Sequence, residues 1–530
     1  MATHVVENQV PPFEGRNLFD VDPVLPGLLK TLSADAHETA LRQVGERTGS
    51  AEYLEMARRA NRNPPVLRTH DRFGNRVDDV DFDPSWHELL DGSIGRGMHA
   101  VAWTDPGGWV ARASYNYLES QVEPGHWCPV SMTASAVGAV RMEPDLAAEW
   151  EPRLLSRVYD PTPRPAGSKS GVLVGMGMTE KQGGSDVRAN TTTASPLGDG
   201  RYRIEGHKWF TSAPTSDAFL VLAQAPGGLT CFFVPRFDED GGRNAIRIQR
   251  LKDKLGNRSN ASSEVEFEGA TAHRVGEEGR GVVTIIEMVN GTRLDCIAGS
   301  AGIMRQAVSQ AIHHARHRSA FGSKLFDKPL MRNVLCDLEI EVEAAAWLMG
   351  RVAHSFDRAG HDPSERQLRR ILTPIAKYWV TKRCTEVVRE SLECLGGNGY
   401  VEESLLPMLY RESPLNAIWE GSGNVIALDV LRVVRREPEA VEALVGLLRR
   451  GSDEAGYDAE STIADIAGTP EAGARSLVER LAVLTQAALL TENARPAVAE
   501  AFVASRLEGR SGRLYGTLTG EYDADAILEA

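Results

Sequence analysis

The chain has 530 residues, 42% of them hydrophobic and 25% charged, which is enough for three or four globular domains with sizeable cores. Its formal net charge of −14 argues against a whole-surface attraction to nucleic acid. The N-terminus has no basic region followed by an apolar run, and no stretch approaches the ~20 apolar residues of a membrane span. We therefore expect a cytoplasmic protein with no membrane partner.

The residue types that bind metals are dispersed along the chain. The six cysteines form no C-x-x-C pattern, so we expect buried thiols in a reducing compartment. His313 and His317 are four residues apart and could face a metal from one helix, but no carboxylate is suitably placed between them. We expect no metal site.

The first two segments differ in their local patterns. Residues 1–170 combine helical patterns with Pro- and Gly-rich loops, and we expect a mostly helical N-terminal domain. Residues 171–285 consist of short runs rich in Val, Ile, Phe and Tyr between Gly, Asp and Pro, which predicts a central antiparallel β domain. Four runs in it have strand patterns: 201–205, 264–268, 219–223 and 229–234.

Residues 286–437 have the period of helices. Apolar residues recur every four positions from Leu330 to Gly350, which predicts a helix with a buried stripe. The sequence Asp362-Pro-Ser-Glu365 has the N-cap, the Pro and the Glu that begin a helix. A Gly-rich run at 396–399 should follow its end, and a further helix should begin near Asn424.

Residues 438–530 form a C-terminal extension with further helical patterns, such as 474–490. From residue 437 to the end, 8 Lys and Arg face 17 Asp and Glu, a net charge of −9. The element order is therefore helical, β, helical, helical. The predicted fold class is α+β and mainly α.

One Gly-rich segment in the β region is suited to bind a polar ligand. Gly183, Gly184 and Ser185 follow a strand that should end at Met178-Thr179. Positive φ at the glycines would turn successive backbone N–H groups to one side, toward a cofactor edge or a phosphate. An ordinary Gly-rich turn has the same composition, and the segment lacks the G-x-G-x-x-G pattern of a Rossmann site.

A second segment places two aromatic residues before two hydroxyls. Trp209 and Phe210 could pack against a planar cofactor ring while Thr211 or Ser212 binds its heteroatoms. An aromatic pair in the core would explain the same residues.

A third segment contains a carboxylate between apolar and flexible residues. Glu420 follows Ile418 and Trp419, which should partly desolvate it and raise its pKa toward that of a general base. The N–H groups of 421–424 at a helix start could bind phosphate oxygens. A Glu that merely caps the helix is the alternative.

Five motifs in one order resemble those of the acyl-CoA dehydrogenase family. They are Met178-Thr-Glu-Lys-Gln-Gly-Gly-Ser-Asp, Lys208-Trp-Phe, Arg318-Ser-Ala-Phe-Gly, Leu395-Gly-Gly-Asn-Gly-Tyr and Trp419-Glu-Gly-Ser, and the spacing fits from about residue 100 to 436. The sequence is most similar to the AidB-like branch, through Thr3-His-Val-Val-Glu-Asn-Gln, Lys181-Gln182, the segment 419–424 and the C-terminal extension.

This resemblance implies an acyl-CoA-dehydrogenase-like fold with one FAD per subunit of a homotetramer. It implies that Arg318 reaches the FAD diphosphate across a subunit interface, where a permanent guanidinium suits a phosphate. The other implied cofactor-binding residues are Met178, Thr179, Gly183, Gly184 and Ser185; Trp209, Phe210, Thr211 and Ser212; and Ile418, Trp419, Gly421, Ser422, Gly423 and Asn424.

The resemblance also implies the reaction. Glu420 aligns with the catalytic base of the family and would remove the α-proton of an acyl-CoA, while the flavin accepts a hydride from the β-carbon and a trans-2-enoyl product forms. Electron-transfer flavoprotein or another acceptor would then reoxidise the flavin.

Two alternative functions stay open. AidB-like proteins are linked to DNA binding and the alkylation stress response, with little dehydrogenase activity, and Trp419 replaces the Tyr that is common before the base. The acidic tail does not favour DNA, and the basic cluster of residues 366–383 could be a solvated helix face or a subunit contact. A flavin oxidase on the same scaffold is the other alternative.

Overall fold

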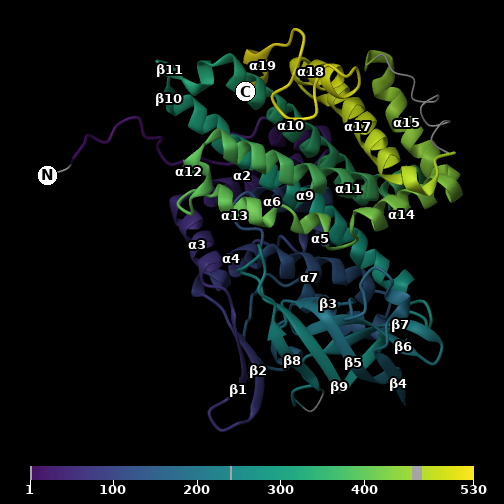
Figure 1. Cartoon of the computed structure of the whole chain (residues 1–530). Coiled ribbons are helices and arrows are strands. Elements are labelled where there is room, and N and C mark those ends of the chain that lie inside the picture. Colours follow the sequence, from purple (N-terminus) through teal and green to yellow (C-terminus); the bar gives the residue numbers. More distant parts are fainter. Residues whose placement is uncertain (1–2, 239–240, 456–467, 530) are drawn as a thin grey trace. The chain divides into compact units, whose positions relative to one another are not determined.

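A computed structural model describes residues 3–238, 241–455 and 468–529 (Figure 1). The chain divides into two compact units. Unit 1 contains residues 1–54, 106–122 and 293–530, and unit 2 contains residues 55–105 and 123–292. The four sequence domains stay a prediction.

Unit 2 is built around a seven-stranded sheet (Figure 1). Its strands are β3 (Val174–Gly177), β4 (Thr193–Gly198), β5 (Arg201–Ser212), β6 (Ala218–Ala225), β7 (Gly228–Pro235), β8 (Ile246–Leu251) and β9 (Ser262–Val275). The order is β3-β6-β4-β5-β9-β7, β8 also pairs with β9, and β6 pairs with β7, so the path closes on itself. Most pairs are antiparallel, whereas β6 is parallel to β3 and to one residue of β4.

All four predicted strand runs are confirmed. The runs 219–223 and 229–234 are buried within β6 and β7, as their apolar composition predicts. Buried and exposed residues alternate over the first five residues of β5, and Phe219, Phe232 and Val234 lie in the core of the sheet.

A β-hairpin in unit 2 departs from the mostly helical segment that we predicted before residue 171. Strands β1 (Val66–His70) and β2 (Arg76–Asp81) pair antiparallel, and the hairpin extends away from the sheet of unit 2 (Figure 1). Its base is fixed because Leu67 and Val80 pack against the core of the sheet. Short strands with several charged residues have too weak a hydrophobic pattern to be predicted from the sequence.

The remaining elements of the N-terminal half are helical. They are α1 (Leu25–Thr31), α2 (Glu38–Thr48), α3 (Ala51–Arg62), α4 (Pro84–Gly95), α5 (Val101–Thr104), α6 (Gly108–Glu119), α7 (Trp127–Val140) and α8 (Pro144–Leu154), with short 3-10 turns at Asp35–His37, Ala166–Ser168 and Val187–Ala189.

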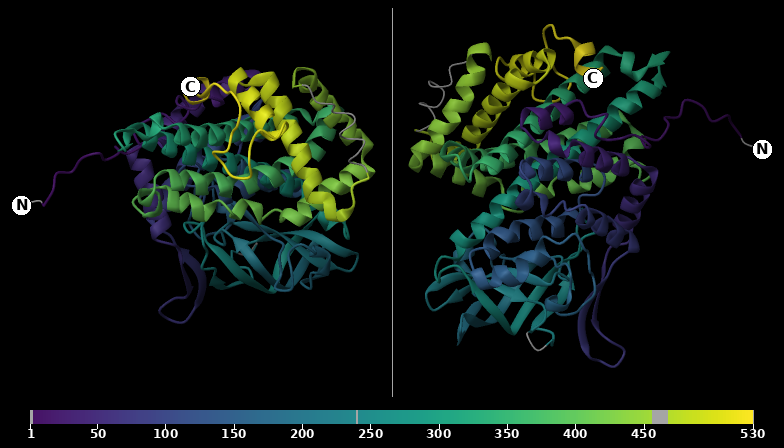
Figure 2. Two further views of the ribbon diagram at one scale, coloured as in Figure 1. Left: turned by 45° about the horizontal axis from the view of Figure 1, so that its top comes forward. Right: turned by 180° about the vertical axis from the view of Figure 1, so that it is seen from behind.

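Unit 1 is a helical assembly in which α10, α11 and α17 lie side by side (Figures 1 and 2). Its later elements are α9 (Gly281–His317, in unit 1 from Arg293 on), β10 (Ser319–Ala320), β11 (Ser323–Lys324), α10 (Pro329–Arg358), α11 (Pro363–Cys394), α12 (Gly397–Tyr400), α13 (Leu406–Glu412), α14 (Gly423–Arg436), α15 (Pro438–Ala455), α17 (Ala474–Asn493), α18 (Pro496–Arg506) and α19 (Ala524–Leu528). Three 3-10 turns are η4 (Leu325–Asp327), η5 (Leu415–Ala417) and η6 (Glu471–Gly473).

The predicted helix signals are largely confirmed. The Asp362 side chain accepts hydrogen bonds from the backbone N–H groups of Ser364 and Glu365 at the start of α11. Helix α14 begins at Gly423, one residue before the predicted start. Leu330 is an exception to the buried stripe of α10, because its side chain is 82% exposed in the first turn.

Helix α10 carries four buried acidic residues, and each of them pairs with an arginine. Asp337, Glu339, Glu341 and Glu343 are all at most 3% exposed. Arg305 of α9 binds Glu339 at 2.7 Å, and Arg383 of α11 binds Glu341 at 3.0 Å. Arg495 and Arg506, at the two ends of α18, bind Glu343 and Asp337. The C-terminal extension is therefore attached to α10 through buried charges.

None of the helices in the described ranges combines the length and the apolar composition needed to span a membrane. No disulfide joins cysteines in that part of the chain, where five of the six are buried and Cys394 is half-buried.

Candidate functional site

The Gly-rich loop of unit 2 directly follows β3, which ends at Gly177, one residue before the predicted end at Met178-Thr179. The backbone N–H of Trp209 donates to the carbonyl of Thr179 at 2.8 Å, which ties the loop to β5. Gly183 and Gly184 do not adopt the positive φ that we predicted. Instead, Gly184 permits a close approach, because a Cβ there would lie 2.6 Å from Thr179 Oγ1. Ser185 is exposed next to it.

A buried ion pair anchors this loop. Lys208 Nζ lies 2.7 Å from Glu180 Oε1, and both side chains are 0% exposed. Glu180 also accepts the backbone N–H groups of Thr191 and Thr192, so it closes the loop at its far end. Burial acts to raise the pKa of Glu180, but Lys208 and these N–H groups outweigh it and lower the pKa to about 2. Burial lowers the pKa of Lys208 to about 8 against the effect of Glu180.

The predicted aromatic and hydroxyl residues form the end of β5. Phe210 is 50% exposed, whereas Trp209 is half-buried beneath Lys252, whose Nζ lies 3.3 Å from the centre of the Trp209 ring. Ser212 Oγ lies 3.1 Å from Ser262 Oγ.

Thr211 offers a test of whether this site suits a polar cofactor. Its side chain is 2% exposed, and its hydroxyl has no hydrogen-bond partner within the described residues. A Cβ on Gly177 would lie 3.2 Å from that oxygen, so a larger residue there would crowd it. A buried hydroxyl without a partner costs about 1–3 kcal/mol, which a heteroatom of a bound ring would recover. These residues therefore fit a flavin.

The Glu420 segment lies in unit 1, between η5 and α14. Glu420 has φ +60°, in the left-handed region, and Gly421 follows with φ +110°. Such a conformation at a non-glycine residue costs about 1–3 kcal/mol and is typical of functional sites. Trp419 Nε1 donates to Asn416 Oδ1 at 2.8 Å, and Asn416 donates to Ser300 Oγ at 3.1 Å, so the tryptophan is fixed to α9.

Two cationic side chains fix the backbone at Glu420 and at the next residue. Arg293 Nε donates to the carbonyl of Glu420 at 3.1 Å, and Lys377 Nζ donates to the carbonyl of Gly421 at 2.6 Å. Lys377 is 1% exposed, and burial lowers its pKa to about 8 although the charge of Glu420 acts to raise it. Asp429 in turn binds Arg293 at 3.2 Å.

The surroundings of Glu420 are thus more polar than the sequence suggested. Ile418, which we expected to help desolvate the carboxylate, is 64% exposed, and Glu420 itself is half-buried. Arg293 and Lys377 were not among the predicted site residues. No local signal marks them, because they lie 127 and 44 positions before the residues whose carbonyls they bind.

The start of α14 is positively charged. Ser422 is its N-cap residue without a side-chain cap, and Asn424 Oδ1 accepts from Arg475 Nε at 2.8 Å. Lys382 lies so close to Gly423 that a Cβ there would be 2.9 Å from its Nζ. The helix dipole and these cations together favour an anion, as the sequence predicted for residues 421–424.

Arg318 lies at the junction of α9 and β10. Its guanidinium donates to the carbonyl of Asn8, and no carboxylate of the described residues forms an ion pair with it. The charge is therefore available to an anion.

The predicted basic cluster on α11 is largely neutralised inside unit 1. Arg370 binds Asp429 and Glu437, Arg383 binds Glu341, and Lys377 is buried near Glu420. Arg366 donates to the carbonyl of Ala359. These contacts occupy the charges inside unit 1, so they do not support a solvent-exposed basic face or a DNA-binding face on α11.

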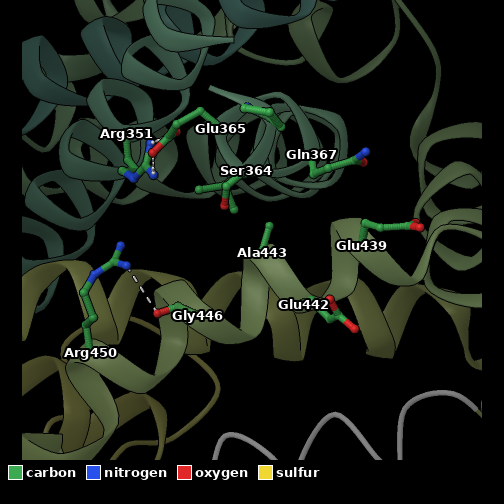
Figure 3. A pocket seen from close by; sticks show the side chains of 11 residues that line it. Arg351, Ser364, Glu365, Gln367, Glu439, Glu442, Ala443, Gly446 and Arg450 are labelled. Atoms are coloured by element: carbon green, nitrogen blue, oxygen red, sulfur yellow. Dashed lines mark hydrogen bonds and ion pairs between the residues drawn. The ribbon is translucent and has the colours of Figure 1, made fainter. Parts of the chain in front are cut away.

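A cavity beside α11 and the histidine pair of α9 lie outside the predicted functional site. A cavity of about 440 Å³ lies between the first turns of α11 and helix α15, where Arg351 and Glu365 form an ion pair, and none of the predicted site residues lines it (Figure 3). His313 and His317 each direct a ring nitrogen to a backbone carbonyl, and no cluster of three metal-binding side chains occurs in the described ranges.

Comparisons with known proteins cover the whole chain. Residues 8–161 match the N-terminal domain of the adaptive response protein AidB, residues 175–270 the acyl-CoA dehydrogenase middle domain, and residues 279–434 the acyl-CoA dehydrogenase C-terminal domain. The AidB protein of Escherichia coli (strain K12) is 45% identical over 100% of this chain and 98% of its own length. Acyl-CoA dehydrogenase family member 11 of Caenorhabditis elegans is 33% identical over 79% of this chain and 70% of its own length.

Solved structures of acyl-CoA dehydrogenases superpose on this chain. The crystal structure of Caenorhabditis elegans ACDH-11 in complex with C11-CoA superposes with a TM-score of 0.86 and 28% identity, over 96% of this chain and 94% of that chain. Butyryl-CoA dehydrogenase from Megasphaera elsdenii has a TM-score of 0.62 and 19% identity, over 77% of this chain and 98% of that chain, which is a likeness of fold alone.

Proposed function

Because the chain belongs to the acyl-CoA dehydrogenase family and is an acyl-CoA-dehydrogenase-like flavoprotein, we propose that Glu420 is the base that removes the α-proton of an acyl-CoA substrate. The observation that carries this proposal is the backbone at Glu420. The backbone that carries this carboxylate is strained, and Arg293 and Lys377 hold its carbonyls at Glu420 and Gly421, so the origin of the side chain is fixed.

The cofactor of this proposal is FAD. Thr211, with its buried hydroxyl, together with Trp209, Phe210 and Ser212, would lie along the ring system. The Gly-rich loop, with Met178, Thr179, Gly183, Gly184 and Ser185, would bind the flavin or its phosphates. The start of α14, from Gly421 to Asn424, would hold the diphosphate or the adenosine, with Ile418 and Trp419 beside it.

The reaction then divides between the chain and the cofactor. Glu420 takes the α-proton, the electrons of that C–H bond form the new double bond, and the hydrogen leaves the β-carbon as a hydride. When bound, FAD supplies the hydride acceptor. Lys377 lies close enough to Glu420 that the charge of Glu420 acts to raise the pKa of Lys377.

The substrate class follows from relatives. The ACDH-11 structure, which shares the fold at 28% identity, contains C11-CoA, and we propose an acyl-CoA for this chain as well. Electron-transfer flavoprotein or another acceptor would accept the electrons, and the chain would act as a homotetramer.

The test compares the parent protein with Glu420→Gln under anaerobic conditions. We expect both proteins to purify yellow, and only the parent to bleach when an acyl-CoA from a panel of chain lengths is added. Glu393→Gln, whose side chain is 70% exposed on α11, serves as the control and should bleach like the parent. Bleaching of Glu420→Gln at the parent rate would exclude Glu420 as the base.

A further inference from the structure

The motif Thr3-His-Val-Val-Glu-Asn-Gln9 lies in an extended N-terminal arm, which we define as residues 3–13 (Figures 1 and 2). The arm has no helix or strand of its own, and Val5 and Val6 are 82% and 75% exposed. An exposed extended segment gains little from burial, so its order depends on a few specific contacts.

Asn8 makes the central contact. Its side-chain Nδ2 donates to the carbonyl of Ser319 at 2.8 Å, and its Oδ1 accepts the backbone N–H of Ser319 at 2.8 Å. The amide thus binds both polar groups of one backbone residue, as a neighbouring strand would. The carbonyl of Asn8 also accepts a hydrogen bond from the guanidinium of Arg318.

The conformation of Asn8 is specialised for this contact. Its φ is +55°, in the left-handed region that asparagine tolerates better than most residues. Both the backbone and the side chain of Asn8 are therefore directed at the Arg318-Ser319 pair.

A second contact fixes the arm to the end of α9. His313 Nε2 lies 2.8 Å from the carbonyl of Pro11, and the rings of Phe13 and His313 are 5.2 Å apart. With the arm attached at both Asn8 and Pro11, its position relative to Arg318 is defined within unit 1.

The turn after α9 carries a surplus of positive charge. Arg318, Lys324 and Lys328 form no ion pair within the described chain. Lys324 and Lys328 donate to the carbonyls of His317 and Phe321, which closes the turn around Arg318. Asp327 is the single acidic residue between 318 and 328. Such a turn suits a phosphate-bearing ligand.

We infer that Asn8 is a positioning residue for the cofactor: the arm sets the direction of the Arg318 guanidinium so that it binds a diphosphate. This inference rests on the proposed function, in which the chain binds FAD, and on the role that the family resemblance implies for Arg318, which is to bind the diphosphate of that FAD. It gives the N-terminal motif a role within the flavin site. It also predicts that the arm matters for FAD affinity although Asn8 itself need not touch FAD.

The experiment measures FAD release from the yellow protein on dilution, by the rise in flavin fluorescence. Asn8→Gly removes the amide without adding backbone strain, because glycine tolerates positive φ. We expect FAD to dissociate about three- to tenfold more readily, as for the loss of one or two modest hydrogen bonds. Gln9→Ala, which loses only a bond to the carbonyl of Glu7, should match the parent.

Arg318→Gln separates the inference from the proposed function. We expect it to weaken FAD binding more than Asn8→Gly, and the double variant to equal Arg318→Gln, because Asn8 acts through Arg318. If Arg318→Gln releases FAD readily and Asn8→Gly behaves as the parent, the role of Asn8 is wrong. If Arg318→Gln also behaves as the parent, the assignment of Arg318 to the FAD diphosphate is wrong. A weakened affinity for CoA with unchanged affinity for FAD would likewise overturn the inference.

Discussion

At the scale of single residues, Glu420 could be predicted from the sequence, whereas the residues that hold its backbone could not. The motif around Glu420 was visible in the sequence, but the side chains that hold it were not. Arg293 comes from α9 and Lys377 from α11, and only the packing of these helices brings them to the carbonyls of Glu420 and Gly421. The predicted desolvation by Ile418 failed because that side chain points to solvent.

Lys377→Met tests whether Lys377 positions the base. Methionine keeps an unbranched apolar side chain but loses the hydrogen bond to Gly421. We expect kcat to fall about tenfold while KM for the acyl-CoA stays nearly unchanged, since a misplaced base affects the chemical step. Lys30→Met, an exposed lysine of α1, is the control.

The pH profile adds a readout that a purely structural role would not change. Because the pKa of Lys377 is lowered to about 8, its positive charge is present below that pH and lost above it. The parent rate should therefore show a transition near pH 8 that Lys377→Met lacks. Equal kcat values and equal pH profiles would rule out the positioning role.

At the scale of elements, the Gly-rich loop depends on the Glu180–Lys208 ion pair. Its partners lie in the loop and in β5, and both are fully buried. Removing one charge leaves the other buried without a counter-charge, which costs about 3–5 kcal/mol.

Glu180→Gln tests this anchor through the dependence of stability on pH. The pKa of Glu180 is about 2 in the folded chain, below its ordinary value of 4.5, so its contribution is full above pH 4.5 and is lost as the pH falls toward 2. We expect the variant to be about 3 kcal/mol less stable at pH 7 and to lose less stability between pH 4.5 and 2. Urea unfolding at several pH values measures both effects.

The control for this pair is Glu268→Gln, whose carboxylate pairs with Arg247 at the surface and is 56% exposed. It should change stability by less than about 1 kcal/mol. An acid dependence of Glu180→Gln that is as steep as that of the parent would contradict the role of this ion pair.

Most elements could be predicted from the sequence because their signals are local. Period-2 runs gave β5 and β9, and the sequence from Asp362 to Glu365 gave the start of α11. The β1–β2 hairpin was missed because its charged strands lack an apolar face of their own until Leu67 and Val80 meet the sheet. The φ angles of Gly183 and Gly184 were wrong because composition alone does not distinguish a need for positive φ from a need for space beside Thr179.

At the scale of the whole molecule, no role could be predicted for residues 438–530, and the net charge of −9 from residue 437 to the end was the one feature that stood out. Within unit 1, arginines of this extension bind the buried acids of α10. Overall charge conceals such pairs, because the few arginines that matter are outnumbered by exposed acidic residues. The extension is thus bound to α10, whose buried acids also pair with Arg305 of α9 and Arg383 of α11.

Arg506→Met tests this attachment. Arg506 is a shared partner of Asp337 and Glu341, which are both 1% exposed, so its loss leaves buried negative charge. We expect a loss of about 3 kcal/mol in the free energy of unfolding and a lower melting temperature. Arg510→Met, whose exposed side chain pairs with Glu508, should have little effect, and equal melting temperatures for the two variants would contradict the attachment.

The central claim is that Glu420 breaks the α-C–H bond of an acyl-CoA, and the most direct measurement is the rate of anaerobic flavin bleaching with a substrate deuterated at its α-carbon. The account predicts that the parent bleaches more slowly with the deuterated than with the ordinary substrate, and that Glu420→Gln, still yellow, bleaches with neither. Bleaching of Glu420→Gln at the parent rate with both substrates would contradict it.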